Sequence, residues 1–273
     1  MTPTDFPGIT FLNIKNLDTF LEEKPVLYKY MPLEHALSTL ENKSFWLSDP
    51  CEWIDPFEKF FLKAKYLTPG GDSIDFPFLG RTFATCITHE RHSEAQWITY
   101  SENSIAIRFD IDTFKFLEQL SKYAIKNSNK VYFGQVEYHK RDEIMKHDLN
   151  EIIFKEENGT LNRNIKDFGF CARLLLLKRI DFSYENEFRI IVCKKNKVKS
   201  KGINFEYNCE NKELIRSLTV TPKIKDHTME MLRNYLSNTF DMQPKSDKLG
   251  RLQPRVLRSR LYDEVNNTEI SIE

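Results

Sequence analysis

The segment Glu187–Cys193, with the sequence Glu-Phe-Arg-Ile-Ile-Val-Cys, constrains the fold more than any other part of the chain. Its second half is apolar at every position, which is typical of a strand buried on both faces of a sheet. At strand spacing, Glu187 and Arg189 project to one face, together with Glu185 just before the strand. A solvated edge explains these charges but not the apolar continuation. We therefore expect a central strand with a functional, charged beginning.

The remaining apolar patterns alternate irregularly between strand and helix spacing. We expect further strands at Val26–Met31, Phe45–Ser48, Thr82–Thr88, Ser104–Phe109, Tyr132–Tyr138 and Leu218–Thr221. We expect helices at Leu33–Leu40, Ser93–Tyr100, Phe114–Ile125 and Thr228–Leu236, and over Arg141–Ile180 except for a polar loop near Asn158. A turn is expected at Thr68–Asp72.

The absence of a regular strand–helix–strand repeat in this pattern indicates the fold class. The sequence predicts an α+β fold, with a mixed, mostly antiparallel central sheet and flanking helices. We expect one domain over residues 1–262 and a polar C-terminal tail over residues 263–273.

The composition excludes several classes of protein. The chain has 40 Lys and Arg against 40 Asp and Glu, so it lacks the basic footprint of a nonspecific DNA-binding domain. Its 21 Phe and 11 Tyr favour a strand-rich core with aromatic-lined clefts. The N-terminus has no basic start followed by a long apolar run, and the five cysteines form no CxxC pair. We therefore expect a cytoplasmic protein with reduced thiols and no membrane association.

A second group of candidate site residues lies near the N-terminus. The expected strand at Val26–Met31 contains Tyr28, Lys29 and Tyr30, and the next strand opens into an acidic loop with two Asp-Pro dipeptides. The candidates in and before this loop are Ser48, Asp49, Asp55 and Glu58. Alternatively, the tyrosines pack in the core, Lys29 is solvated and the aspartates make only local turn hydrogen bonds.

A third group is Gln96–Ser101. Trp97 and Tyr100 are three residues apart, so on a helix they share one face. They form either an aromatic core stripe or a wall on which a planar ring stacks, with Tyr100 or Ser101 donating a hydrogen bond.

Other chemistries find little support in the sequence. Cys86, His89 and His92 have a spacing that a metal tolerates, but Arg91 intrudes and no fourth ligand is evident. A Gly-rich phosphate loop and a GxSxG motif are both absent from the sequence.

Several short motifs follow one another along the chain in a specific order. They are Leu27–Tyr30, Asp55–Glu58, Trp97 with Tyr100 after a strand holding Cys86, Val136 with Tyr138, Lys178 ahead of Tyr184–Arg189, and Ser259 with Leu261 and Tyr262. Together they resemble the bacterial family known as domain of unknown function 2971, over roughly Val26–Tyr262. Ile54 departs from the asparagine usual before Asp-Pro-Phe, and Ser104 departs from a usual glycine.

The motif order is also similar to that of ADP-ribosyltransferases. This resemblance implies an NAD-consuming enzyme, either an ADP-ribosyltransferase or an NAD glycohydrolase. It implies that the first strand grips NAD through Lys29 or Tyr28, where these enzymes usually have His or Arg. It implies a middle aromatic or hydroxyl residue, here Tyr100 or Ser101, and a catalytic glutamate at the start of a late strand, here Glu187. Cleavage of the nicotinamide–ribose bond develops positive charge on the ribose, which a fixed carboxylate stabilises.

The same resemblance implies roles for neighbouring residues and partners. Glu185, the first glutamate of the Glu-x-Glu pair, positions or activates the acceptor, while Tyr30, Trp97 and Arg189 complete the NAD-binding group. The expected partners are NAD or a related nucleotide, and a protein or nucleic-acid acceptor, with no metal. Members of the family often sit near phage-defence genes, which implies the role of a toxin or defence effector.

Two other interpretations of these residues stay open. In a metal-dependent nuclease or phosphohydrolase, Mg²⁺ is held by carboxylates and Lys29 stabilises the phosphoryl transition state. The carboxylates available for this are Asp49, Asp55, Glu58, Glu185 and Glu187. In a non-enzymatic module, the acidic and aromatic cleft senses a nucleotide or a partner.

Overall fold

The computed structural model describes residues 2–23, 25–67, 73–74, 76, 78–102, 104–146, 167–247 and 251–263. The turn expected at Thr68–Asp72, the loop expected near Asn158 and all of the C-terminal tail beyond Asp263 lie outside the described residues.

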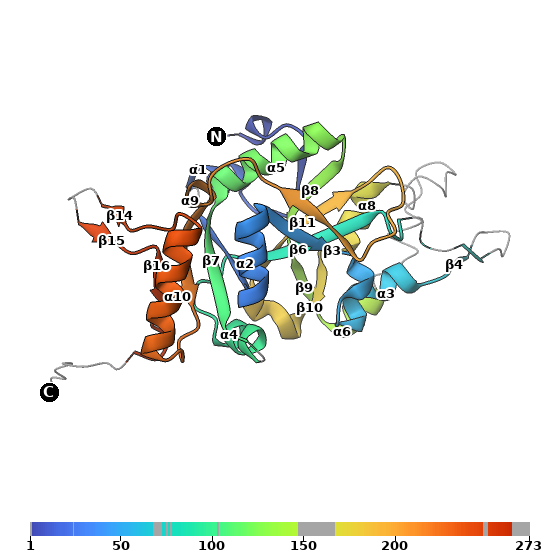
Figure 1. The fold of residues 1–273 in the computed structure, drawn as a ribbon. Coiled ribbons are helices and arrows are strands. Elements are labelled where there is room, and N and C mark those ends of the chain that lie inside the picture. Colours follow the sequence, from blue (N-terminus) through green and yellow to red (C-terminus); the bar gives the residue numbers. More distant parts are fainter. Residues whose placement is uncertain are drawn as a thin grey trace, which may run out of the picture.

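A ten-stranded mixed sheet forms the centre of the molecule (Figure 1). Its main strand order is β1-β8-β11-β6-β2-β7-β13-β16, and β12 joins it through β3, which pairs with β6. The strands are β1 (Ile9–Leu12), β2 (Val26–Pro32), β3 (Ser44–Ser48), β6 (Thr82–Thr88), β7 (Ala106–Asp112), β8 (Lys130–Gln135), β11 (Glu187–Cys193), β12 (Gly202–Glu206), β13 (Ile215–Val220) and β16 (Val256–Arg258). Among these described strands, β1–β8 and β13–β16 pair in parallel, and the other pairs are antiparallel. The expected α+β fold with a mostly antiparallel sheet is confirmed.

Helices cover both faces of this sheet. They are α1 (Leu17–Glu23), α2 (Leu33–Asn42), α3 (Pro56–Lys63), α4 (Glu94–Ser101), α5 (Thr113–Asn127), α6 (Arg141–Lys146), α8 (Phe168–Leu174), α9 (Asn211–Leu214) and α10 (Asp226–Thr239). Figure 1 shows α10 beside β16 at one end of the molecule, and α3 and α6 at the other. Within the described residues, none of these helices is long and apolar enough to cross a membrane.

Strand β11 is central, as its sequence predicts. Its residues Ile190 and Val192 belong to the larger hydrophobic cluster, which also contains Leu40 of α2 and Leu120 of α5. The alternate residue Ile191 belongs to a second cluster on the other face of the sheet, with members from α3 and α8. Each face of the strand therefore buries apolar side chains, which explains the uninterrupted apolar run.

One segment expected to be helical is a strand. Leu177–Arg179 forms β10, which pairs in parallel with β9 (Glu137–His139) in a separate two-stranded sheet. The backbone N–H of Glu137 also donates to the carbonyl of Leu176, at 2.8 Å. The apolar residues before β10 satisfy a helix pattern equally well, so long-range strand pairing decided the conformation.

The main sheet divides at β6. On one side, β6 pairs with β11 at every residue from Thr82 to Thr88. On its other side it pairs with β2 only between Thr88 and Tyr28, and with β3 only between Ala84 and Ser48. Strand β2 pairs instead with β7 along its full length. Strands β2 and β6 therefore meet at Tyr28 and Thr88 and diverge from that pair.

Candidate active site

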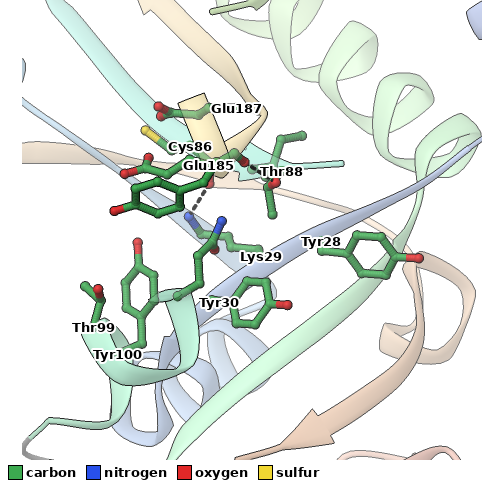
Figure 2. Close-up of a pocket in the computed structure, with 12 residues that line it drawn as sticks. Tyr28, Lys29, Tyr30, Cys86, Thr88, Thr99, Tyr100, Glu185 and Glu187 are labelled. Atoms are coloured by element: carbon green, nitrogen blue, oxygen red, sulfur yellow. Dashed lines mark hydrogen bonds between the residues drawn. The ribbon is translucent and has the colours of Figure 1, made fainter. Parts of the chain in front are cut away.

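A hollow lies where β2 and β6 diverge. Its empty volume is about 450 Å³, which includes open solvent at its mouth. Its lining comes from β2, β6, α4, the 3-10 helix η3 (Ile180–Glu185) and the start of β11. Figure 2 shows that Lys29, Tyr100, Glu185 and Glu187 meet around it, although they come from four different elements.

Glu187 is a buried carboxylate whose charge is held in place. Its Oε1 accepts a hydrogen bond from Nε of Arg189 at 3.1 Å, and its Oε2 accepts from Nη2 of Arg189 and Nζ of Lys178, both at 3.0 Å. Burial by itself would raise the pKa of Glu187, but Arg189 and Lys178 outweigh it and lower the pKa to about 2. Glu187 is therefore ionised at neutral pH.

Lys178 joins three carboxylates. Its Nζ lies 2.6 Å from Oε2 of Glu185, 3.0 Å from Oε2 of Glu187 and 3.2 Å from Oε1 of Glu58. Burial would lower the pKa of Lys178, but the three carboxylates outweigh it and raise that pKa. The repulsion between the neighbouring carboxylates of Glu185 and Glu187 is thus offset by the ammonium of Lys178, which contacts both.

Glu185 has a different environment from Glu187. Its side chain is 23% exposed, against 3% for Glu187, so it is the more accessible of the two from the hollow. Burial raises the pKa of Glu185, the charge of Glu187 raises it further and Lys178 opposes both. Two neighbouring carboxyl groups whose pKa values are pushed apart are suited to different roles, one as a fixed charge and one as a proton acceptor.

Lys29 lies in the same hollow, between the strand β6 and the side chain of Tyr30 (Figure 2). Its Nζ donates to the carbonyl of Cys86 at 2.8 Å and to Oγ1 of Thr85 at 2.9 Å. Burial lowers the pKa of Lys29, and neighbouring Cys86 and Glu187 offset part of that decrease. An ammonium has three N–H donors, so one donor of Lys29 is unused among the described residues and is available to a ligand. Lys29 and Glu187 thus line one hollow.

Tyr100 contributes a phenol without a partner. Within the described residues its hydroxyl makes no hydrogen bond, and Figure 2 shows it directed toward Glu185. Burial raises the pKa of Tyr100, and the nearby Cys86 and Glu187 raise it further, so the group is a neutral donor. Tyr184 also lines the hollow. Tyr28, Tyr30, Tyr100 and Tyr184 together give the hollow an aromatic wall.

The other aromatic and hydroxyl candidates take supporting positions. Trp97 is buried outside the lining, where its ring packs edge-on against Tyr30 with centroids 4.9 Å apart. Ser101 is also outside the lining, and its Oγ donates to the carbonyl of Trp97 at 2.5 Å. Tyr28 and Tyr30 do line the hollow, and the hydroxyl of Tyr30 donates to the carbonyl of Arg91 at 2.7 Å.

The first part of the acidic loop forms local hydrogen bonds outside the hollow. Oγ of Ser48 accepts from Nε1 of Trp53 at 2.9 Å. Asp49 and Asp55 each cap the helical turn that follows, accepting a backbone N–H at 2.9 Å. Asp55 also pairs with Arg179 at 3.2 Å. Apart from the ion pair of Asp55 with Arg179, these residues make the local turn hydrogen bonds that the alternative interpretation of the loop predicts.

Glu58 connects the acidic loop to the site through its contact with Arg189. Its Oε1 lies 2.5 Å from Nη2 of Arg189, which is fully buried. The guanidinium of Arg189 is also 4.6 Å from the ring of Trp53. Arg189 therefore does not reach the hollow but supports Glu187 from the side of the acidic loop.

Sequence reasoning assigned no role to several residues of the site. Lys178 appeared only as part of a family motif, and its segment was expected to be helical, which hid its position beside the two glutamates. Cys86, Gln96 and Tyr184 also line the hollow, whereas the sequence suggests only a metal-ligand role for Cys86 and no specific role for Gln96 or Tyr184. These residues belong to the site because of the order of the strands in the sheet, which no local sequence pattern encodes.

The carboxylates of the site surround a cation of the protein itself, the ammonium of Lys178. Among the described residues, no group of three or more His, Cys, Asp or Glu is placed to hold a metal ion. Glu58, Glu185 and Glu187 instead converge on Nζ of Lys178. A divalent ion bound by these oxygens would have to displace that ammonium.

A protein-family model matches part of the chain. The model of the family described as "Protein of unknown function (DUF2971)" matches residues 96–190, so the resemblance to this family is confirmed over that segment. The segment runs from α4 into β11 and contains Tyr100, Lys178, Glu185 and Glu187. No curated protein matches the chain.

Two solved structures, both of DarT from Thermus sp. 2.9, show a weak likeness. DarT in complex with NAD+ has 12% sequence identity and a TM-score of 0.32, with 87% of this chain and 96% of that chain covered. DarT in complex with ADP-ribosylated ssDNA has 11% identity and a TM-score of 0.34, with 87% and 95% covered. Scores of this size assign no residue of this chain to a role.

Proposed function

We propose that the hollow binds NAD and that the protein cleaves the bond between nicotinamide and ribose. The observation that carries this proposal is the ionised, buried Glu187 at an aromatic-walled hollow that also contains Lys29. A carboxylate fixed in this way is suited to stabilise positive charge that develops on a bound sugar.

The chemistry assigns different work to the two glutamates. The bond between C1′ of the ribose and the ring nitrogen of nicotinamide breaks, and its electron pair leaves with nicotinamide, which becomes neutral. Positive charge spreads over C1′ and the ring oxygen, where the carboxylate of Glu187 stabilises it. An acceptor oxygen then attacks C1′ and gives its proton to Glu185, whose raised pKa makes it the better base.

The other lining residues bind and orient the substrate. The rings of Tyr100 and Tyr184 supply faces for the nicotinamide ring. The free phenol of Tyr100 and the third N–H donor of Lys29 are available to substrate oxygens. Because Lys29 is already anchored to β6, it orients a ligand with little loss of side-chain entropy.

The metal-dependent nuclease is the weaker alternative. Its ligands would be carboxylates that already neutralise Lys178 and Arg189, while Asp49 and Asp55 cap helical turns elsewhere. The donor set therefore favours a buried ion network with a fixed charge over a cage for Mg²⁺.

The test is release of nicotinamide from NAD by the purified protein, with and without EDTA. The proposal predicts release that EDTA does not reduce. Labelled NAD and a cell lysate then separate the two forms of the activity, since a transferase labels a protein or nucleic acid and a glycohydrolase leaves free ADP-ribose. Release that needs Mg²⁺, or none with or without lysate, would overturn the proposal.

The role of a toxin or phage-defence effector rests on this activity. An enzyme that consumes NAD without restraint lowers the NAD pool of the cell that contains it. Induced expression of the wild type should lower both NAD and growth, and Glu187→Gln at equal protein level should lower neither. Equal growth inhibition by both proteins would contradict a role that acts through NAD.

A further inference from the structure

The segment 194–201, which connects β11 to β12, is strongly basic. Its sequence, Lys-Lys-Asn-Lys-Val-Lys-Ser-Lys, contains five lysines and no acidic residue, although the charges of the whole chain balance. It follows β11 at the end opposite Glu187, and a strand of seven residues puts about 20 Å between the two. None of the residues 194–201 lines the hollow. The segment is therefore a separate feature of the surface, which the proposed function does not explain.

The backbone of this basic segment is held in place. The backbone N–H of Lys194 donates to the carbonyl of Arg81 at 2.7 Å, and Nε of Arg81 donates to the carbonyl of Lys194 at 3.3 Å. Farther along, the backbone N–H of Val198 donates to the carbonyl of Gly80 at 2.8 Å, and its side chain packs against the larger hydrophobic cluster. The segment is thus fixed at two points to the residues that precede β6.

The lysine side chains of the segment are not held in this way. Lys195, Lys197 and Lys199 are exposed, and within the described residues none of them makes an ion pair. Lys201 pairs with Glu52 at 3.4 Å, and both of these side chains are exposed. Like charges repel one another, and a backbone fixed at two points limits how far the ammonium groups can move apart. A ligand that carries several negative charges relieves this repulsion.

An exposed tryptophan lies beside this segment. Phe45 and Leu47 of β3 are fully buried, whereas Trp46 between them points to the other face of the sheet and is 50% exposed. Its indole lies over Gly202, the first residue of β12, where an added Cβ would come within 2.3 Å of Cζ2 of the ring. Glycine permits this close approach because it has no Cβ. Gly202 directly follows Lys201, so the ring and the basic segment adjoin.

This combination of groups matches a single-stranded nucleic acid. Proteins that bind single strands combine cations, which contact the phosphate backbone, with exposed aromatic rings, on which bases stack. A duplex uses the faces of its bases for its own stacking, so it leaves the tryptophan without a partner. A lipid surface requires apolar side chains that project from the protein, whereas this ring packs against a strand.

We infer that Trp46 and the exposed lysines of the segment 194–201 form a second binding surface, which binds single-stranded nucleic acid at the end of β11 opposite the hollow. This surface is separate from the proposed NAD site, and its binding does not depend on whether NAD is cleaved. The equal numbers of acidic and basic residues in the whole chain, which exclude an overall basic footprint, conceal this local surface.

The lysines are tested by titration of a fluorescently labelled single-stranded oligonucleotide, without NAD, at several salt concentrations. Binding by the wild type should weaken as salt rises, because lysines that bind phosphates release counterions. The double variant Lys197→Gln with Lys199→Gln should reduce the slope of log affinity against log salt concentration by about 1.4, at about 0.7 for each phosphate contact.

The matched control removes the same charge elsewhere. Lys225→Gln with Lys245→Gln changes two exposed lysines, one just before α10 and one in β14 (Lys245–Ser246). Figure 1 shows these elements at one end of the molecule and α8 at the other, and the guanidinium of Arg81 beside the basic segment lies 5.2 Å from the ring of Phe168 in α8. This control should bind with the wild-type slope. No binding by the wild type at about 50 mM salt, or an equal loss of slope in both double variants, would overturn the surface.

The tryptophan is tested by a readout that does not depend on charge. Trp46→Ala should weaken binding of the single strand about tenfold and leave the salt slope unchanged, because stacking is not ionic, and Trp46→Phe should keep most of the affinity. Thermal unfolding must show that both variants are folded. A duplex of the same sequence should bind more weakly than the single strand. Full affinity in folded Trp46→Ala, tighter binding of the duplex, or binding to anionic lipid vesicles in place of the oligonucleotide would overturn the surface.

Discussion

Nζ of Lys178 lies 3.0 Å from Oε2 of Glu187, and the same ammonium contacts two further carboxylates. The carboxylates of Glu58, Glu185 and Glu187 therefore depend on Lys178, on a short strand outside the main sheet, for much of their charge compensation. Without this ammonium, the carboxylates of Glu58 and Glu187 would have Arg189 as their remaining cation. Lys178 therefore links the site to the stability of the fold.

We predict that Lys178→Met destabilises the protein by about 3–5 kcal/mol at neutral pH, because it leaves buried charges without their partner. Without Lys178 the carboxylates repel one another, so their pKa values in the folded protein rise. Protonation then relieves the repulsion, and the deficit relative to the wild type shrinks as the pH falls. Urea unfolding across pH 4 to 8 measures this, with exposed Lys199→Met as the control. A deficit independent of pH would contradict the explanation.

Glu185→Gln should reduce transfer to an acceptor more than it reduces nicotinamide release. The reason is that Glu185 accepts the acceptor proton, whereas Glu187 stabilises the charge on the ribose. The pKa of Glu185 is raised above its ordinary value of 4.5, and only the ionised form accepts a proton. Wild-type transfer should therefore fall as the pH decreases through that raised pKa. Equal losses of transfer and release in the variant would argue against separate roles.

The hydroxyl of Tyr100 should matter for activity and not for folding. It has no partner among the described residues, so Tyr100→Phe should leave the free energy of unfolding unchanged and lower nicotinamide release about tenfold. Tyr207→Phe is the matched contrast, because its buried hydroxyl bonds to Asn211 at 2.7 Å. That variant should lose about 1 kcal/mol of stability and keep its activity. Destabilisation by Tyr100→Phe would show that its hydroxyl is structural.

Asn186 sets the turn between the two glutamates. Its φ of 41° is in the left-handed region, which asparagine and glycine tolerate better than other residues. Asn186→Gly should be near neutral, whereas Asn186→Ala should cost about 1 kcal/mol and lower activity, because the strain acts on the backbone that carries Glu185 and Glu187. Thermal unfolding and nicotinamide release of the two variants check this. Equal behaviour of the Gly and Ala variants would contradict it.

Local patterns predicted much of the fold. The strand at Thr82–Thr88 is found as expected, and the strand at Val26–Met31 extends by one residue. The helix over Phe114–Ile125 is two residues longer at its C-terminal end and one longer at its N-terminal end. Apolar residues recur in these elements at strand or helix spacing, because the positions that are buried must be apolar. The segment at Leu177–Arg179 differed because its pairing partner, β9, is remote in sequence, and propensity does not decide such pairing.

The site was predictable only in part for the same reason. The charge pattern of Glu185 and Glu187 stood out because carboxylates at the start of an apolar strand are unusual. Which residues face them depends on the neighbours of β6 in the sheet, where β11 lies on one side and β2 on the other. That order places Lys29 near Glu187, whereas Trp97 is turned into the core by its contact with Tyr30.

The most direct test of the central claim is the rate of nicotinamide release by the wild type and by Glu187→Gln, at a saturating concentration of NAD. Removal of a preorganised charge from such a site typically costs about 10²–10³ in rate, so we predict a loss of at least that size. Thermal unfolding and ADP-ribose binding must show that the variant is folded and still occupied. A folded Glu187→Gln variant that binds ADP-ribose and releases nicotinamide at the wild-type rate would contradict the account.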